Sequence, residues 1–152
     1  METDIYDSYV AEIDKLIRRV SFVIKCRGRD ILDEFNITIP QFNALLLLRE
    51  NGDMTIGDLG SKMYLASSTA TDLIDRMERD GLVVRERDSS DRRVVRLHMQ
   101  EKGHQMIREV MENRKRYLSE ILSHLSPDEK EALKQSLESL YVLMKPACKK
   151  QD

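Results

Sequence analysis

The sequence has few cysteines and no long apolar run, and each shortage excludes a class of protein. Cys26 and Cys148 are the only cysteines among 152 residues, too few for a small secreted scaffold held together by disulfides. The chain has no run of about eighteen apolar residues and does not begin with a charged segment followed by an apolar one. We therefore expect a soluble cytoplasmic protein with reduced thiols and no contact with a membrane.

The residue patterns of enzymes and metal proteins are also missing. His98, His104 and His124 are scattered, without cysteine or carboxylate partners at ligand spacing. The sequence contains no glycine-rich phosphate loop, no nucleophile elbow and no paired catalytic motif. It therefore predicts a protein that is not an enzyme and has neither a cofactor nor a metal site.

The composition that is present indicates one mostly helical unit. Three prolines and six glycines in 152 residues leave long stretches without helix breakers, and 41% of the residues are hydrophobic. This length supports one sizeable core and is short for two ordinary domains. The formal net charge of −2 means that any contact with nucleic acid must come from a local basic patch.

Apolar residues recur at spacings of three and four over most of the chain, a pattern typical of amphipathic helices. Thr38, Thr55 and Ser126 are candidate N-caps, and Gly81 is a candidate helix stop. At Gly28 a bend in the first helix is plausible. The helices are expected over residues 5–35, 38–50, 55–63, 67–80, 101–125 and 126–144.

A β-hairpin is expected between the fourth and fifth helices. Two short strand-like runs, 82–87 and 94–99, flank a polar and basic tip at 88–93. The fold class is therefore mainly α with a small β-hairpin. Four helices, a basic hairpin and two further helices, in this order, are typical of a winged helix-turn-helix with additional helices at both ends.

The first turn of the fourth helix is rich in hydroxyl side chains. In a winged helix-turn-helix this turn enters the major groove, where hydroxyls and main-chain N–H groups reach phosphates and base edges. The candidates are Ser67, Ser68, Thr69 and Thr71. The alternative is that these residues only start a helix.

Arginines gather around the predicted hairpin. Arg92 and Arg93 at its tip would suit insertion into a narrow minor groove. Arg87 and Arg96 would meet phosphates, and Arg76 lies near the same surface. The alternative is an ordinary solvated surface, but the order and spacing of these features favour double-stranded DNA as the partner.

The sequence resembles the MarR family of transcription regulators over about residues 37 to 110. The resemblance is carried by segments 39–48, 54–59, 67–71 and 75–85 and by the wing Asp88-Ser89-Ser90-Asp91-Arg92-Arg93 followed by Glu101-Lys102-Gly103. It implies a winged helix-turn-helix DNA-binding domain at 37–100 and a helical dimerisation region at 1–36 and 101–152. It further implies a homodimer on a palindromic operator, acting as a repressor, with Asp91 orienting Arg93.

Dimerisation has independent support from the sequence, because two long terminal apolar stripes exceed what one subunit is expected to cover. The alternative is an ordinary intrachain core. The resemblance also implies release from DNA by a small aromatic or anionic ligand. Such a ligand would bind in a crevice between the dimer helices and the winged domain. The candidate lining residues are Tyr9, Ile13, Ile17, Phe42 and Leu46, and the alternative is that these residues are only core.

Two other functions stay open. Cys26 lies between Lys25 and Arg27, which could favour a thiolate and a redox sensor, although an inert helix cysteine is the simpler interpretation. A winged fold can also bind a protein instead of DNA, and Asp72 and Asp75 on the outward face of the fourth helix favour that alternative.

Three positions depart from the family pattern. Asp72 stands where the family often has a basic or neutral residue. Ala66 and Gln100 replace the short polar residues that are common at helix starts, so we expect these two starts to lack a side-chain cap.

Overall fold

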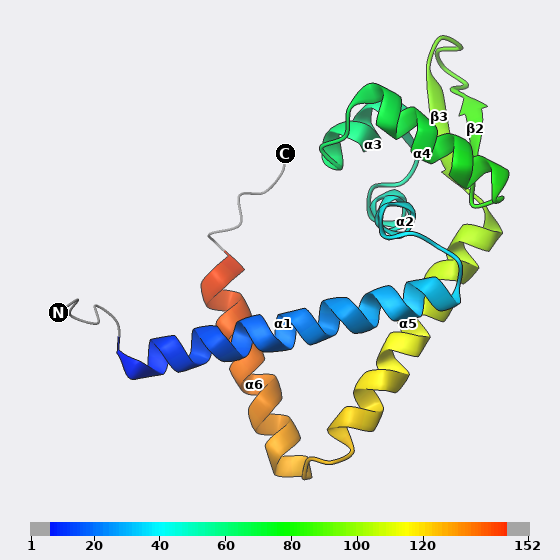
Figure 1. Ribbon diagram of the computed structural model, residues 1–152. Helices are drawn as coiled ribbons and strands as arrows, with labels where there is room; N and C mark the ends of the chain where they lie inside the picture. Colours follow the sequence, from blue (N-terminus) through cyan, green and yellow to red (C-terminus); the bar gives the residue numbers. More distant parts are fainter. Residues whose placement is uncertain (1–6, 146–152) are drawn as a thin grey trace.

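The computed structural model describes residues 7–145 as six α-helices and three short β-strands (Figure 1). The elements are α1 (Ser8–Glu34), α2 (Ile39–Asn51), β1 (Met54–Thr55), α3 (Ile56–Lys62), α4 (Ser67–Arg79), β2 (Val83–Arg87), β3 (Val95–Met99), α5 (Glu101–Leu122) and α6 (Pro127–Met144). The predicted fold class, mainly α with a small β-hairpin, is confirmed.

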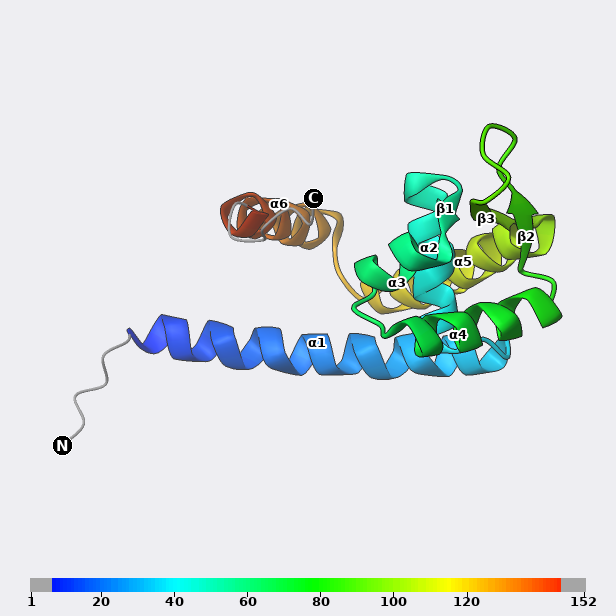
Figure 2. The same cartoon turned by 90° about the horizontal axis from the view of Figure 1, so that it is seen from above.

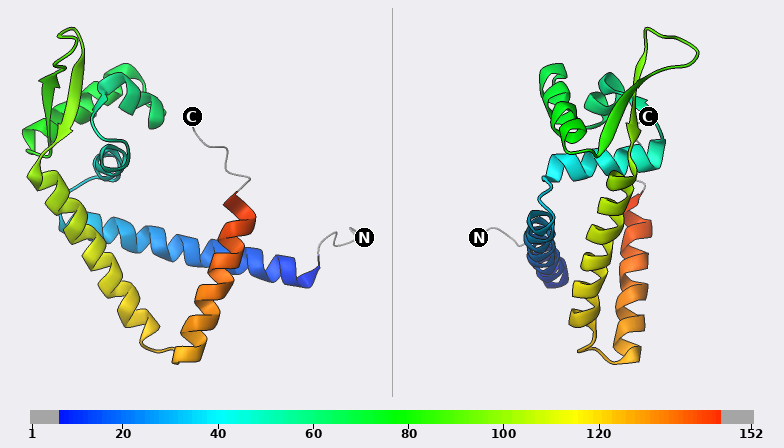
Figure 3. Two further views of the ribbon diagram at one scale, coloured as in Figure 1. Left: turned by 180° about the vertical axis from the view of Figure 1, so that it is seen from behind. Right: turned by 90° about the vertical axis from the view of Figure 1, so that its right-hand side faces the viewer.

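The elements form one globular unit from which long helices extend. Helices α2, α3 and α4 pack with the sheet at one end of the molecule, while α1 and α5 run away from that unit (Figures 1 and 3). After α5 the chain turns back into α6, which diverges from α5 (Figure 3, left). No residue of α6 is buried, so little holds this helix within the subunit.

Side-chain caps start the helices where the sequence indicates them. Thr38 accepts a hydrogen bond from the backbone N–H of Gln41, and the Gln41 side chain accepts one from the backbone N–H of Thr38. Ser126 and Glu129 form the same reciprocal pair at the start of α6. Thr55 Oγ1 accepts from the backbone N–H of Asp58 at 3.0 Å. These bonds satisfy amides that the first helical turn leaves without partners.

The ends of the two long helices differ slightly from the prediction. Helix α1 begins at Ser8 after the N-cap Asp7, and Ile5 lies outside the described residues. It continues through Gly28 without interruption (Figure 2), so the interruption of the apolar stripe does not break it. Helix α5 ends at Leu122, three residues before the predicted end at residue 125, and Ser123 is its C-cap.

The hairpin belongs to a three-stranded antiparallel sheet with the order β1-β3-β2. The pairing of β2 with β3 runs from Val83 opposite Met99 to Arg87 opposite Val95. The short strand β1 adds Met54 opposite Leu97. Sequence analysis did not identify β1, because two residues are too few to show a strand periodicity.

The core lies where α2, α4, α5 and the sheet meet. Leu45, Ile74, Met77 and Leu97 are fully buried there. Helix α4 buries Ala70, Leu73, Ile74 and Met77, the face that the sequence predicts. This packing fixes the orientation of α4 and therefore which of its side chains face solvent. Among the described residues, no helix combines the length and apolar character needed to span a membrane.

Candidate nucleic-acid interface

A close approach of two helices fixes the angle at which α4 projects. A Cβ atom at Gly60 of α3 would lie 3.0 Å from the Cβ of Ala70 in α4, so only a very small residue fits without displacement. The connecting turn is closed by a hydrogen bond from the Leu65 backbone N–H to the Gly60 carbonyl at 2.8 Å, and Tyr64 adopts a φ of 55°. The start of α4 is therefore presented outward by a tightly packed pair of helices.

The four hydroxyl residues predicted for the major groove, Ser67, Ser68, Thr69 and Thr71, are all exposed on the first turns of α4. The Thr71 hydroxyl donates to the Ser67 carbonyl at 2.9 Å, which fixes its rotamer and leaves its oxygen free to accept. The N-cap Ala66 makes no side-chain cap, as expected. The first amides of α4 are thus available to an anionic group, which a helix N-terminus attracts.

Arg85 of β2 ties the wing to α4. Its guanidinium lies 2.5 Å from an Asp75 carboxylate oxygen and also pairs with the Glu78 carboxylate. These hydrogen bonds, the one to Asp75 first, raise the pKa of Arg85 above its ordinary value. The bridge places one positive charge between two carboxylates of α4, so the acidic character that the sequence indicates for this face is reduced but not removed.

The wing tip is organised by Asp88. One oxygen of its carboxylate accepts the Ser90 and Asp91 amides at 2.7 and 3.3 Å, and the other lies 2.5 Å from Arg96 Nε. The hydrogen bond from Arg96 is the largest of the effects that lower the pKa of Asp88 to about 2. The tip is therefore a hydrogen-bonded loop, and the Nε–H group of Arg96 is used within it.

The remaining predicted arginines are exposed and available. Arg76, Arg87, Arg92 and Arg93 form no ion pair with any residue of the described part of the chain. The Asp91 carboxylate accepts from the Arg93 backbone N–H at 3.0 Å, so it orders the backbone here and not the guanidinium. Helix α4 and the hairpin lie in the same globular unit, with the loop of the hairpin projecting from it (Figure 1).

The residues proposed to line an effector crevice do not come together within this subunit. Tyr9, Ile13 and Ile17 are exposed on α1, whereas Phe42 is buried in α2 and Leu46 is half-buried there. Leu46 lines a different surface hollow, between α2 and α3. Of the five, only Phe42 lines a small pocket where α1, α2 and α5 meet, together with Ile31 and Arg114, and it does not line the neighbouring cavity between α1 and α5.

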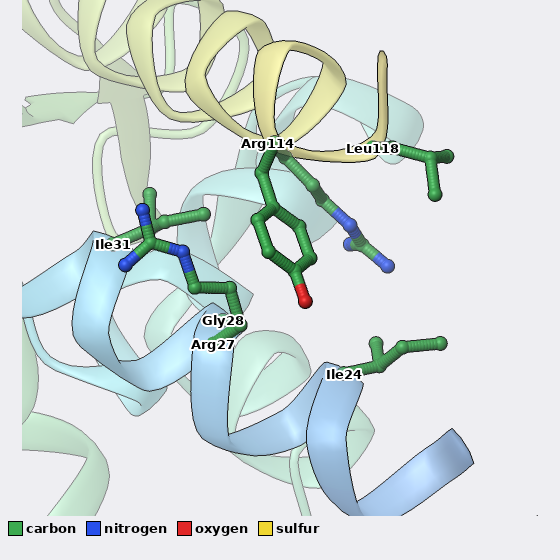
Figure 4. A pocket seen from close by; sticks show the side chains of 7 residues that line it. Ile24, Arg27, Gly28, Ile31, Arg114 and Leu118 are labelled. Atoms are coloured by element: carbon green, nitrogen blue, oxygen red, sulfur yellow. The ribbon is translucent and has the colours of Figure 1, made fainter. Parts of the chain in front are cut away.

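Sequence analysis missed the polar residues of the cavity between α1 and α5. It has a volume of about 80 Å³ and is lined by Ile24, Arg27, Gly28, Ile31, Arg114, Tyr117 and Leu118 (Figure 4). The Arg27 guanidinium lies 5.3 Å from the centre of the Tyr117 ring, and its buried Nε has no hydrogen-bond partner among residues 7–145. Residues almost ninety positions apart form this site, so no local pattern could have revealed it.

The other candidate residues show no assembled site. Cys26 is a half-buried free thiol on α1, and Cys148 lies outside the described residues. Over residues 7–145, no group of three or more histidine, cysteine or carboxylate side chains is placed to hold a metal ion. His98 instead pairs with Asp53 at 3.0 Å.

Comparison with known proteins identifies one family. The model of the MarR family matches residues 37–95. The chain is 47% identical to the uncharacterized HTH-type transcriptional regulator YsmB of Bacillus subtilis, over 90% of this chain and 94% of that protein. It is 33% identical to the organic hydroperoxide resistance transcriptional regulator of the same species, over 86% of this chain and 90% of that protein.

Solved structures agree with this result. A MarR family protein from Bacillus stearothermophilus is 47% identical and superposes with a TM-score of 0.79, covering 93% of this chain and 99% of that one. A mutant MepR from S. aureus bound to an oligodeoxyribonucleotide is 22% identical, with a TM-score of 0.73 over 87% of this chain and 97% of its own. At that identity the likeness is one of fold.

Proposed function

The chain belongs to the MarR family and is a DNA-binding transcription regulator, not an enzyme, and we propose that it acts as a homodimeric repressor on a palindromic operator. The observation that carries this proposal is the arrangement of α4 and the wing. Uncapped helix amides, exposed hydroxyls and unpaired arginines lie in one compact unit on a chain of net charge −2. Its place of action is then the cytoplasm, where bacterial DNA lies.

The proposed domain division separates the winged unit from the long helices, although Ile31 of α1 and Ile107 of α5 share its core. Residues 37–100 form the DNA-binding domain, and residues 1–36 and 101–152 form the dimerisation region. Large apolar side chains are exposed along the helices of the second region, where a second copy of the chain would cover them. They include Val20 and Phe22 of α1, Leu118 and Ile121 of α5, and Leu137, Tyr141 and Leu143 of α6.

The dimer is tested by replacing an apolar residue on α6. Leu137→Glu places a carboxylate in the proposed interface, whereas Gln135→Glu places one on the polar side of the same helix. Light scattering after size exclusion should give twice the chain mass of 17.7 kDa for the parent and for Gln135→Glu. Leu137→Glu should shift the mass toward one chain or prevent folding. A parent protein that elutes as a single chain at all concentrations would contradict the dimer.

Each group of DNA contacts has a proposed role. Ser67, Ser68, Thr69 and Thr71 face the major groove, where Thr71 contributes to sequence preference. Arg93 enters the minor groove from a loop that Asp91 orders. Arg76, Arg87, Arg92 and the free donors of Arg96 contact phosphates. The two winged domains of a dimer would then occupy half-sites about 10 bp apart, centre to centre.

The experiment is selection of bound duplexes from a random pool, followed by titration of the selected site at several salt concentrations. We expect an inverted repeat and a steep salt dependence, because each phosphate contact adds about −0.9 to the slope of log affinity against log salt. Arg93→Ala should weaken binding strongly. Lys130→Ala, the same charge change on distant α6, should not. A flat salt response would favour the alternative of a protein-interaction module.

The cavity between α1 and α5 is the proposed effector site. Arg27 and Arg114 supply positive charge, and Ile24, Ile31 and Tyr117 supply apolar and aromatic surface. This combination fits a small aromatic or anionic molecule. A ligand that binds the free protein more tightly than the DNA complex would release the operator. Salicylate is a suitable first probe, and Arg114→Gln should reduce its effect on operator affinity.

A redox response through Cys26 is the second candidate. The half-buried free thiol and the 33% identity to an organic hydroperoxide resistance regulator favour it. Treatment with an organic hydroperoxide should then weaken operator binding by the parent and not by Cys26→Ser. Equal loss of binding in both proteins would exclude Cys26 as the sensor.

A further inference from the structure

The outward side of α4 carries a row of polar residues. Ser68, Asp72, Asp75 and Arg79 follow one another at spacings of four, three and four, and all are exposed. A helix turns 100° per residue, so this row lies opposite the buried face formed by Ala70, Leu73, Ile74 and Met77. When α4 lies in a major groove with its buried face toward the protein, this row faces the base edges.

Of the two carboxylates in this row, only one takes part in an ion pair within residues 7–145. Asp75 is paired with Arg85, which also binds Glu78 on the adjoining side of the helix. Asp72 forms no hydrogen bond or ion pair through its side chain with any residue between 7 and 145, and it lines a hollow with Thr69 and Arg76. An exposed carboxylate in this position brings negative charge toward DNA phosphates, and no ion pair with a residue between 7 and 145 offsets it.

The chemistry of the major groove restricts what can compensate that charge. An ionised carboxylate only accepts hydrogen bonds. Guanine presents two acceptors in the groove, and thymine presents an acceptor and a methyl group, so both disfavour it. Adenine presents the N6 amino donor, but its N7 acceptor lies beside that donor and repels a carboxylate, so adenine is also disfavoured. Cytosine presents the N4 amino donor, so it is the base that can satisfy Asp72.

We propose that Asp72 is a specificity-determining residue that accepts a hydrogen bond from the N4 amino group of a cytosine in each half-site. The same carboxylate rejects guanine and thymine at that position, because their acceptors would leave it unpaired and close to phosphates. This inference rests on the proposed DNA-binding mode of α4. It gives the negative charge of Asp72, which otherwise only opposes DNA binding, a role in base selection.

The test compares the sites selected from a random pool by the parent, Asp72→Asn and Asp72→Ala. The parent should select cytosine at one position in each half-site. Asp72→Asn should select adenine there, because an amide can donate to N7 and accept from N6. Asp72→Ala should show no preference at that position and retain the rest of the site. Changing the cytosine in both half-sites should weaken the parent by roughly tenfold or more and leave Asp72→Ala nearly unaffected.

Glu138→Gln on α6 is the matched control, since it removes the same charge from an exposed position far from α4 in the chain. It should select the same site as the parent. Tighter binding by Asp72→Asn and Asp72→Ala to an unchanged site would overturn the proposal and make Asp72 purely repulsive. A parent site without a fixed cytosine would overturn it while leaving the repressor function intact. Recovery of no site would contradict the proposed binding of a palindromic operator, on which this inference rests.

Discussion

Replacing Gly103 with alanine should destabilise the junction between the DNA-binding unit and α5. Gly103 lies in the first turn of α5, where three elements meet. A Cβ atom there would lie 2.7 Å from Met99 Cγ, 2.8 Å from the Leu82 carbonyl oxygen and 3.1 Å from Leu45 Cδ2. The Met99 side chain can move, but the Leu82 carbonyl is backbone and accepts the Gln100 N–H at 2.9 Å. The methyl group therefore fits only if the backbone around Leu82 moves, which costs free energy.

The magnitude follows from two opposing effects. Forcing extra volume into a packed site costs about 1–3 kcal/mol. Alanine is the better helix former and returns up to about 1 kcal/mol. Two contacts below 3.0 Å, one of them with backbone, place the cost in the upper part of its range, so the net loss in the free energy of unfolding should be about 1–2 kcal/mol. Gly28→Ala provides the control, because nothing lies within 4 Å of a Cβ at that position, so only the stabilising effect operates.

Urea unfolding followed by circular dichroism measures both changes. The parent and the variants must be compared at one protein concentration, because the apparent stability of the proposed dimer would depend on it. We expect a lower midpoint for Gly103→Ala and a higher midpoint for Gly28→Ala, with similar slopes. If Gly103→Ala is as stable as the parent, the close contacts at this junction do not constrain the fold and the reasoning is wrong.

Three further outcomes are expected. Asp88→Asn should weaken operator binding in a fluorescence titration even though it removes a negative charge, because it loosens the wing tip that Asp88 and Arg96 hold together; tighter binding would show that Asp88 only repels DNA. The pKa of His98 is raised, chiefly by its hydrogen bond to Asp53. The stability from this pair is therefore present below the ordinary histidine pKa and is lost as the pH rises through the raised value. Asp53→Asn should lower the melting temperature at pH 6 and leave it unchanged at pH 9, and an equal loss at both would contradict this assignment. Ser126→Ala should lower the free energy of unfolding by about 1 kcal/mol in urea because the α6 cap is lost, whereas Ser126→Asp should retain most of it; equal losses would deny the cap a role.

Local signals in the sequence predicted the local structure well. The caps at Thr38, Thr55 and Ser126 and the stop at Gly81, which has a φ of 75°, depend on residues within one turn of each other. The buried face of α4 follows from helical periodicity. The missing cap at Gln100 was also expected and is confirmed. Each of these features is encoded by neighbouring residues.

Features that depend on distant residues could not be predicted in the same way. Strand β1 exists because Met54 pairs with Leu97, and the cavity exists because Arg27 meets Tyr117. The Asp88 and Arg96 pair could have been found, since the antiparallel register of the hairpin brings its two flanks together. The candidate effector residues on α1 lie apart from Phe42 because periodicity identifies a face of a helix and not what covers it.

The length of α5 has a mechanical consequence. A helix of 22 residues spans about 33 Å, and α5 begins directly after the sheet and ends at the turn into α6. In the proposed dimer it would act as a lever arm whose pivot lies at the α6 end. A rotation of about 5° at that pivot displaces the other end by about 3 Å, a substantial fraction of the roughly 3.4 Å rise of one DNA base step. In the proposed dimer, small changes in how the two subunits meet would thus be magnified into the spacing between their wings, without any unfolding of the winged domain itself.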